Sequence, residues 1–321
     1  MSAARFSIVM PAYNAEPFIH AAIRSISMAA GLEYLDQICV VDDGSSDATF
    51  LAAEHALAEF KLPGVVTRTP AKHGASRARA RAIDLVDSPL VMCVDADDLV
   101  LSDRFVDALR AFEDSRVQLV GGDLMPFDDP LGGPRLGAHR RVHLPTVGTD
   151  IAATLLFTCP IWSGVSAFRL GVHDALRPPN VAIGQDWLFA HQVIQAFGPQ
   201  AVANTGTLMI NHRRSSRQVT STFKPDSSDF HPVWAEILSD ALGLSATPAD
   251  LALHAKYSPY HFKPMPTPTP EDMEHWFRWT SKLLDAALEV GYVPFAVSRR
   301  IHQINEMLMM TALYEEAKVT A

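Results

Sequence analysis

Long apolar segments and paired cysteines are both missing from this sequence. No uninterrupted apolar run reaches the about 18 residues that a membrane helix needs, and the first residues lack the apolar stretch of a signal peptide. The three cysteines, Cys39, Cys93 and Cys159, include no C-x-x-C pair, so buried free thiols are expected rather than a metal or redox site built on that motif. We therefore expect a cytoplasmic protein without a transmembrane segment, and peripheral attachment to a membrane stays open.

Positive charge is also scarce. The chain has 27 Lys and Arg against 36 Asp and Glu, a net charge of −9. This balance disfavours a protein that grips nucleic acid through its phosphates, although a local basic face stays open. Walker A, G-x-G-x-x-G and H-E-x-x-H motifs are absent, which excludes the phosphate and metal sites that they define. The apolar share of 48% over 321 residues is enough to bury the core of one large or two ordinary domains.

Short apolar strands alternate with helical segments through the first part of the chain. Strands are predicted at 6–10, 37–41, 65–68 and 90–94, with helices at 16–30, about 47–60 and 76–86. Strands that are apolar throughout are typical of a parallel sheet covered on both faces, and ligands of such sheets bind beyond the carboxyl ends of the strands. The polar stretches 11–14, 42–43 and 95–98 each follow a strand, so we expect them on one rim.

Three carboxylates, Asp95, Asp97 and Asp98, lie within four positions at the end of the fourth strand. Like charges so close repel one another and resist desolvation, so they need positive charge nearby. A divalent cation, Mn²⁺ or Mg²⁺, is the simplest partner, because hard cations prefer carboxylate oxygen. The alternative is that Asp98 or Ser102 caps the next helix and that the other two aspartates are solvated.

Five stretches together resemble the family 2 glycosyltransferases, which bind nucleotide sugars in a GT-A fold. They are FSIVMPAYN at 6–14, VVDDGSSDAT at 40–49, KHGASRARA at 72–80, VMCVDADD at 91–98 and GQDW at 184–187. The resemblance implies an α/β fold, with a Rossmann-like, mostly parallel central sheet flanked by helices. It also implies an enzyme that moves a sugar from a nucleotide-diphosphate donor, most typically a UDP-sugar, to an acceptor hydroxyl.

The resemblance assigns roles to single residues. Tyr13 is similar to the residue that stacks on the nucleotide base, Asp43 to one that accepts a hydrogen bond from the base, and Arg79 to an arginine near the diphosphate. Asp95 resembles the residue that faces the ribose, and Asp97 the one that reaches the metal. The implied nucleotide-sugar site contains Pro11, Tyr13, Asp43, Lys72, Arg79, Asp95 and Asp97, and the implied metal ligands are Asp97, Asp95 and His212.

The acidic motif of the family matches at 184–187, where Gln185 replaces a frequent glutamate and Asp186 is kept. The resemblance therefore implies that Asp186 is the general base of an inverting transfer, in which the acceptor hydroxyl attacks opposite the leaving nucleotide diphosphate. A helix N-cap is the alternative role for Asp186. Lys72 in place of asparagine and Ala80 after the arginine also depart from the family pattern, and they leave the donor's identity open.

The last part of the chain is predicted to be helical, with amphipathic segments at 271–290 and 296–317 after a proline-rich connector at 261–270. We expect a catalytic domain at 1–222 and a helical region at 223–321 that serves as an acceptor lid or an oligomer contact. The acceptor stays open among glycan, lipid, protein, natural product and modified nucleic acid. Two rival functions are an inactive GT-A binding module, which intact aspartates disfavour, and a sugar nucleotidyltransferase, which lacks its expected Gly-rich loop here.

Overall fold

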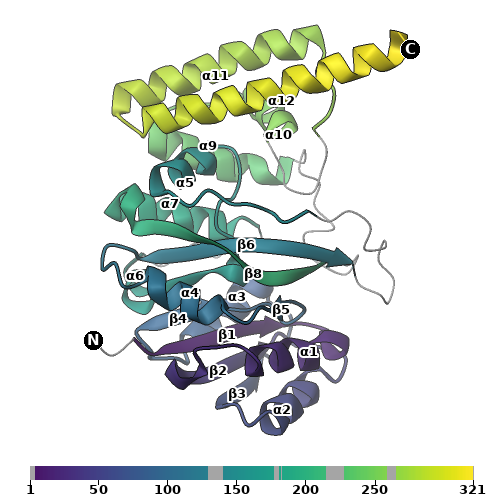
Figure 1. Cartoon of the computed structure of the whole chain (residues 1–321), viewed down its shortest axis with the longest axis vertical. Helices are drawn as coiled ribbons and strands as arrows, with labels where there is room; N and C mark the ends of the chain where they lie inside the picture. The colour runs from purple at the N-terminus through teal and green to yellow at the C-terminus, as the bar shows by residue number, and fades with distance from the viewer. Residues whose placement is uncertain are drawn as a thin grey trace.

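A computed structural model describes residues 4–128, 140–176, 181, 183–214, 228–258 and 265–320 of the chain, with side chains up to 314. Figure 1 shows a central sheet with helices on both sides and a layer of long helices at the C-terminal end. The first half contains β1 (Phe6–Ala12), α1 (Glu16–Ser27), β2 (Leu35–Asp42), α2 (Thr49–Glu59), β3 (Gly64–Arg68), α3 (Ala75–Ile83), β4 (Leu90–Cys93), β5 (Leu99–Val100), α4 (Arg104–Ala111) and β6 (Leu119–Asp128). The second half contains α5 (Gly148–Leu155), β7 (Ala167–Arg169), α6 (Leu170–Leu176), α7 (Gln185–Phe197), β8 (Val202–Arg214), α9 (His231–Leu242), α10 (Pro248–Tyr257), α11 (Pro270–Val290) and α12 (Pro294–Thr320). Short 3-10 helices lie at η1 (Leu32–Tyr34), η2 (Ser163–Val165), η3 (Pro199–Ala201) and η4 (Ser228–Phe230).

The strands form one mixed sheet in the order β3-β2-β1-β4-β7-β6-β8-β5. The first four of these run parallel to one another, as the apolar strand pattern predicted. β7 is antiparallel to both of its neighbours, and the short β5 is antiparallel to β8, which itself pairs with β6 in parallel. The carboxyl ends of β1, β2 and β4 therefore meet at the same edge, where the predicted site residues lie.

Each face of the sheet has its own hydrophobic core. Ile8 and Met10 of β1 belong to the core under α1, α2 and α4, whereas Val9 belongs to the core shared with α3, α5, α7 and the C-terminal helices. Successive strand residues point to opposite faces of the sheet. Because both faces are covered, every residue of β1 is buried, and most of them are apolar. Burial on both faces explains the uninterrupted apolar runs in the sequence.

The C-terminal helices α10 and α11 begin with the same capping arrangement. Thr247 and Thr269 each accept a hydrogen bond from the backbone N–H three residues later, and the carboxylates of Asp250 and Asp272 accept one from the backbone N–H of the cap residue. A proline occupies the first helical position in both cases, where its missing N–H costs nothing. The repeated Thr-Pro-x-Asp pattern therefore marks both helix starts, and the second one ends the predicted proline-rich connector, whose residues 261–264 lie outside the described chain.

An aromatic cluster joins these helices to α7. The ring centroids of Trp187 and Trp234 lie 5.2 Å apart, those of Trp234 and His254 5.4 Å apart, and those of His254 and Trp279 6.0 Å apart. All four side chains are buried. The C-terminal helices thus pack against the residue that follows Asp186 in the chain. The predicted boundary between 222 and 223 lies in a part of the chain that the structure does not describe.

His254 makes the stability of this cluster dependent on pH. Its Nε2 donates to the carbonyl oxygen of Leu156 at 2.9 Å, and its Nδ1 accepts from Trp279 Nε1 at 2.9 Å, so the buried ring is neutral. Burial lowers the pKa of His254 to about 4, below its value of about 6.5 in an unfolded chain. Between these two values the unfolded state binds more protons, so stability must fall as the pH falls from about 6.5 to about 4.

We expect His254 alone to remove about 2 kcal/mol of unfolding free energy between pH 7 and pH 5. Denaturant unfolding at both pH values measures this loss. The matched variant His254→Gln keeps a donor for Leu156 and has no titrating ring, so its loss over the same interval should be smaller by that amount. Equal losses in the two proteins would contradict the assignment.

Candidate active site

Tyr13 lies just beyond the carboxyl end of β1, and the residue is 41% exposed. The ammonium nitrogen of Lys72 lies 3.8 Å from the centroid of this ring, a cation–π contact. Pro11, two residues earlier, is buried inside β1. Of the residues predicted to contact a nucleotide at this strand end, Tyr13 thus presents an aromatic face at the rim, with Lys72 beside it.

Asp43 fixes the loop that carries Lys72. Its buried carboxylate accepts hydrogen bonds from the backbone N–H groups of His73, at 2.9 and 3.0 Å, and Gly74, at 2.7 Å, and from the hydroxyl of Thr69, at 3.2 Å. Gly44 follows with a φ of +69°, and a Cβ there would lie 2.7 Å from the carbonyl carbon of Ala71. The Asp-Gly pair therefore needs both of its residues to hold the loop against β2.

Asp42 has a separate, structural role. It was not among the predicted site residues. Its carboxylate is buried, accepts from Arg68 Nε at 2.7 Å and accepts from the backbone N–H of Ser45 at 3.0 Å. The two neighbouring aspartates thus serve two different loops.

Helix α3 distributes three arginines between two faces, because residues two apart on a helix point in nearly opposite directions. Arg79 points to the aspartates, whereas Arg77 and Arg81, four apart, line a hollow of about 400 Å³ with Arg68 and His73. This hollow is the local basic face that the composition left open. None of the site's carboxylates lines it, but Thr69 and His73 do, and both donate hydrogen bonds to Asp43.

Arg79 connects the two acidic parts of the site. Its Nη2 lies 3.0 Å from Asp95 Oδ1, and its side chain is only 11% exposed. Burial acts to lower the pKa of Arg79, but the charges of Asp95 and Asp186 outweigh it and raise the pKa above its usual value. Arg79 and Asp186 also line one small cavity of about 30 Å³, room for about one water molecule. One buried guanidinium therefore faces carboxylates from β4 and from α7.

The short helix η2 brings the same two carboxylates close together. The backbone N–H of Ser163 donates to Asp186 Oδ2 at 3.0 Å, and the next residue, Gly164, lies against Asp95. A Cβ on Gly164 would lie 2.6 Å from Asp95 Oδ2, so a larger residue there would displace the Asp95 carboxylate from its present position. Ser163 and Gly164 were not predicted as site residues, and no signal in a single sequence distinguishes this glycine from one in an ordinary turn.

Asp186 lies in the first turn of α7, after Gly184, whose φ is +75°. Its second oxygen, Oδ1, accepts from the backbone N–H of Trp187 at 2.9 Å. The alternative role of Asp186 as the N-cap of the helix is wrong, because Gly184 occupies the N-cap position of α7 and Asp186 is the second residue inside the helix. The other carboxylate oxygen is held by η2, so Asp186 is oriented by two elements.

Asp98 is the residue whose role the sequence analysis missed. It is fully buried, its Oδ2 lies 3.1 Å from His212 Nδ1, and its Oδ1 accepts from the backbone N–H of Arg213 at 2.8 Å. α4 begins only at Arg104, so Asp98 does not cap it, and that alternative is wrong for this residue. Asp98 instead fastens the end of β8 to the aspartate turn.

The residues around Asp98 include ligand types that suit a divalent cation, but among the described residues Asp95, Asp97 and His212 do not gather as a group within 4.8 Å of one another. With Nδ1 engaged by Asp98, Nε2 is the nitrogen through which His212 would coordinate a metal, and metal-ligating histidines characteristically bind a carboxylate through the other nitrogen. Burial acts to lower the pKa of His212, but Asp98, and then Asp97 and Asp95, raise it to about 9. The three aspartates therefore create a strongly negative field at the imidazole, which is the environment that a cation would neutralise.

Comparison with known proteins identifies the family of the chain. The model of "Glycosyl transferase family 2" matches residues 7–169, from the second residue of β1 to the end of β7, and this range includes Asp43, Asp95, Asp97 and Asp98. The chain belongs to glycosyl transferase family 2. This membership confirms the enzyme class predicted from the sequence, a glycosyltransferase. It argues against the alternative of a sugar nucleotidyltransferase.

Two solved structures share the fold of this glycosyltransferase over nearly its whole length. S. aureus TarS 1-349 in complex with UDP-GlcNAc has a TM-score of 0.58 at 17% identity, covering 96% of this chain and 89% of that one. Mannosyltransferase PcManGT from Pyrobaculum calidifontis, in complex with GDP-Man and Mn²⁺, has a TM-score of 0.55 at 14% identity, covering 97% and 86%. These similarities confirm the predicted GT-A fold with its additional C-terminal helices.

A curated relative covers less of the chain. The minor teichoic acid biosynthesis protein GgaB of Bacillus subtilis (strain 168) is 29% identical over 136 residues, which is 42% of this chain. The match spans 14% of that longer protein. Across the described parts of the glycosyltransferase, none of the helices combines the length and the apolar character needed to cross a bilayer.

Proposed function

We propose that this glycosyltransferase transfers a sugar from a nucleotide-diphosphate sugar, a UDP-sugar in the first instance, to an acceptor hydroxyl with inversion, and that Asp186 is the general base. The observation that carries the proposal is the link from Asp95 through Arg79 to Asp186. It supports a donor site and a base on the two sides of one sugar position. Inverting transfer needs that arrangement, because the hydroxyl attacks opposite the bond that breaks.

The donor side of the proposal uses the rim of β1, β2 and β4. Tyr13 offers its exposed ring to the base, and Asp43 holds the loop that places Lys72 beside that ring. Asp95 and Arg79 face the ribose and the diphosphate. The guanidinium of Arg79 is already paired and buried, so it is preorganised. It therefore loses little conformational entropy when the donor binds.

The base side of the proposal rests on Asp186. An ionised carboxylate has about four lone-pair positions, so the two backbone hydrogen bonds leave it capacity to accept the proton of an acceptor hydroxyl. Both bonds come from rigid backbone, which fixes the direction of the carboxylate. A positioned base of this kind contributes about 100- to 10,000-fold to the rate.

Mn²⁺ or Mg²⁺ is the proposed cofactor, held by Asp97 and Asp95 with His212. Such a cation, when bound, neutralises charge that develops on the departing nucleotide diphosphate. PcManGT, a fold neighbour in complex with GDP-Man and Mn²⁺, supports this choice. Asp98 contributes by holding the His212 ring in place.

We further propose that residues 1–222 form the catalytic unit and that residues 223–321 form an acceptor lid or an oligomer contact. The contact between Trp187 and Trp234 supports the role of an acceptor lid, because it connects α9 to α7, the helix that carries Asp186. The GgaB similarity supports a teichoic acid as the first acceptor class to try.

A thermal-shift screen of nucleotide sugars with Mn²⁺ tests the donor assignment. We expect a UDP-sugar to raise Tm most, because at 100 times its Kd a ligand adds about 2.7 kcal/mol to native-state stability. The corresponding nucleoside monophosphate, which lacks the β-phosphate, is the matched control and should shift Tm less. A GDP-sugar that exceeds every UDP-sugar would contradict the base preference, and no shift with any donor would contradict the donor site.

A further inference from the structure

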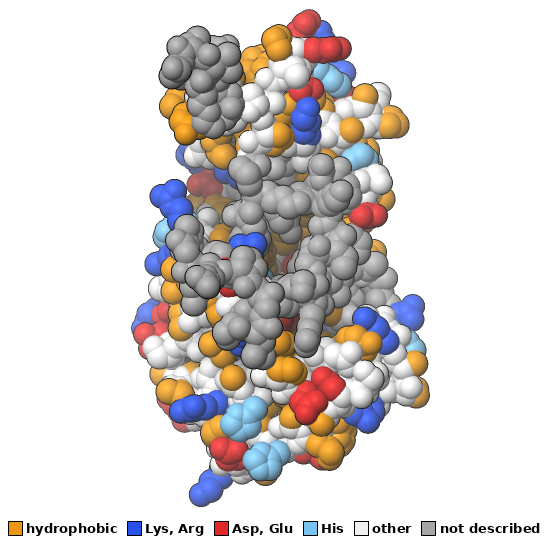
Figure 2. Space-filling model, turned by 90° about the vertical axis from the view of Figure 1, so that its right-hand side faces the viewer, with side chains coloured by type: hydrophobic (Ala, Val, Ile, Leu, Met, Phe, Trp, Pro, Cys, Tyr) orange, Lys and Arg blue, Asp and Glu red, His pale blue; other side chains and the backbone are white. Residues whose placement is uncertain are grey.

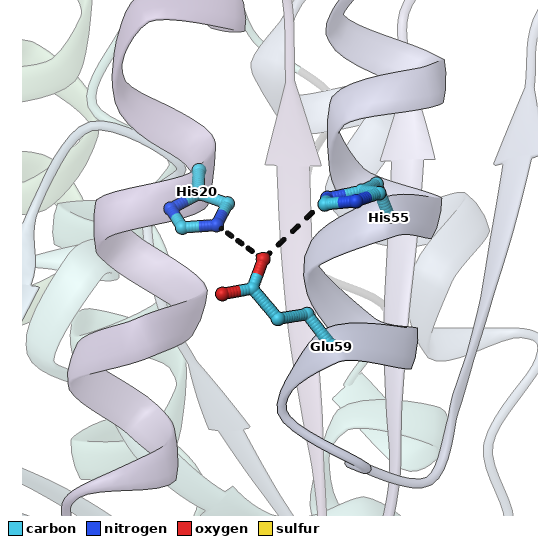
Figure 3. A group of neighbouring side chains, drawn as sticks. All are labelled: His20, His55 and Glu59. Atoms are coloured by element: carbon cyan, nitrogen blue, oxygen red, sulfur yellow. Dashed lines mark hydrogen bonds and ion pairs between the residues drawn. The ribbon is translucent and has the colours of Figure 1, made fainter.

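Two histidines and a glutamate meet on the surface formed by α1 and α2. His20 comes from α1, and His55 and Glu59 come from α2, with all three side chains turned toward one point (Figure 3). His20 Nε2 lies 2.9 Å from Glu59 Oε2, and His55 Nδ1 lies 3.6 Å from the same oxygen. The three coordinating atoms all lie within 4.8 Å of one another. Two helices thus supply three candidate metal ligands at one place.

The arrangement follows from how the two helices pack. His55 and Glu59 are four residues apart, so they lie on one side of α2. α1 and α2 bury their other sides in the core beneath the sheet, through Ile19 and Ile23 on α1 and Ala53 on α2. Accordingly the histidine side chains stay 45% and 75% exposed. Figure 2 shows histidine side chains next to acidic ones at the lower end of the molecule, where α1 and α2 lie.

The ligand set suits a borderline first-row cation rather than Mg²⁺. Zn²⁺ binds imidazole nitrogen and carboxylate oxygen at about 2.0–2.2 Å, so tetrahedral ligands lie about 3.3 Å apart. Separations of 2.9 and 3.6 Å bracket this value, and exposed side chains need only small rotamer adjustments to reach it. Mg²⁺ prefers oxygen ligands in octahedral geometry, which two imidazoles do not supply.

We propose that His20, His55 and Glu59 form a surface site for Zn²⁺ or a related divalent transition metal. This site is separate from the aspartate site, and a metal bound there would hold α1 against α2. The two sites are distinct, because the aspartates follow the carboxyl end of β4, whereas His20, His55 and Glu59 lie on the solvent side of α1 and α2. α1 starts three residues after Tyr13. A metal at this site therefore stabilises the half of the enzyme that carries the donor rim.

The competing description is a surface ion pair without a metal. Arg24 also acts on Glu59, and exposed pairs of this kind contribute little to stability. The two descriptions differ in what they predict for added zinc. Added zinc does not stabilise a protein in which these residues form only an ion pair. It binds to a three-ligand site and stabilises the native state.

Calorimetric titration of the full chain with ZnCl₂, in excess Mg²⁺ to occupy the aspartates, distinguishes them. We expect one zinc event that is lost in the double variant His20→Gln with His55→Gln, and weakened at least about tenfold in either single variant. At 100 times its Kd, zinc should raise Tm of the wild-type protein by about 5 °C and leave the double variant unchanged. Both histidines are exposed, so the variants should match wild-type Tm without zinc.

His302→Gln is the matched control. His302 Nε2 lies 3.3 Å from Glu306 Oε1 in another exposed pair four residues apart, on α12, and none of the described histidines completes this pair to a three-ligand group. This variant should bind zinc as the wild type does. The proposal is overturned if the double variant still shows the full zinc event, or if His302→Gln removes as much binding as the double variant.

Discussion

Asp186→Asn should bind the nucleotide-sugar donor about as tightly as the wild-type enzyme and transfer the sugar about 100- to 10,000-fold more slowly. Asparagine has nearly the shape of aspartate, and its amide oxygen can accept the hydrogen bond from Trp187 or from Ser163. It cannot take a proton from an acceptor hydroxyl. The change therefore removes the proposed base while keeping the cavity beside Arg79.

Calorimetry for donor binding and a transfer assay with saturating acceptor separate the two effects. Asp150→Asn is the matched control, because Asp150 also lies in the first turn of a helix, α5, and is paired there with Arg299. It tests whether loss of any first-turn carboxylate slows the enzyme. Normal donor affinity together with normal turnover in Asp186→Asn would show that the base is another residue.

The part of the fold that the sequence predicted correctly is the part with continuous local signals. β1, β2 and β4 each contain a buried, mainly apolar run because both faces of the sheet are covered, and Asn14, Asp43 and Asp95 follow their ends. By contrast, β7 has three residues, too few to show any period, and it enters the sheet antiparallel between β4 and β6. Its place depends on long-range pairing, which no local pattern encodes.

The same distinction holds in the site. Asp95, Asp97 and Asp186 were found because they lie in motifs of the family. The bond between Asp98 and His212 joins residues 114 positions apart, and a third aspartate beside two others gives no sign of its partner. Only the folded structure therefore shows that His212 and Arg213 are the partners of the aspartate turn. Cys39 and Cys93 are buried free thiols as expected, and Cys159 is partly buried.

Asp97→Ala should abolish the response to Mn²⁺ and lower transfer about 100- to 1,000-fold, the loss typical of removing one stabiliser of developing negative charge. The fold should tolerate this change. Arg213 Nε donates to the backbone carbonyl of Asp97, at 2.8 Å, and alanine keeps that carbonyl. The bonds from Asp98 to His212 and Arg213 also stay. The variant therefore removes one proposed ligand and leaves its scaffold in place.

Transfer rates measured across a Mn²⁺ titration, with the metal first stripped by chelator, give the result. Asp103→Ala is the control, because Asp103 is an exposed aspartate just beyond the same turn, at the start of α4, and should respond to Mn²⁺ as the wild type does. Wild-type activity that persists undiminished in excess chelator would refute the metal's role. An Asp97→Ala enzyme that Mn²⁺ still activates fully would refute the ligand assignment, since Asp95 and His212 alone would then be sufficient to hold the ion.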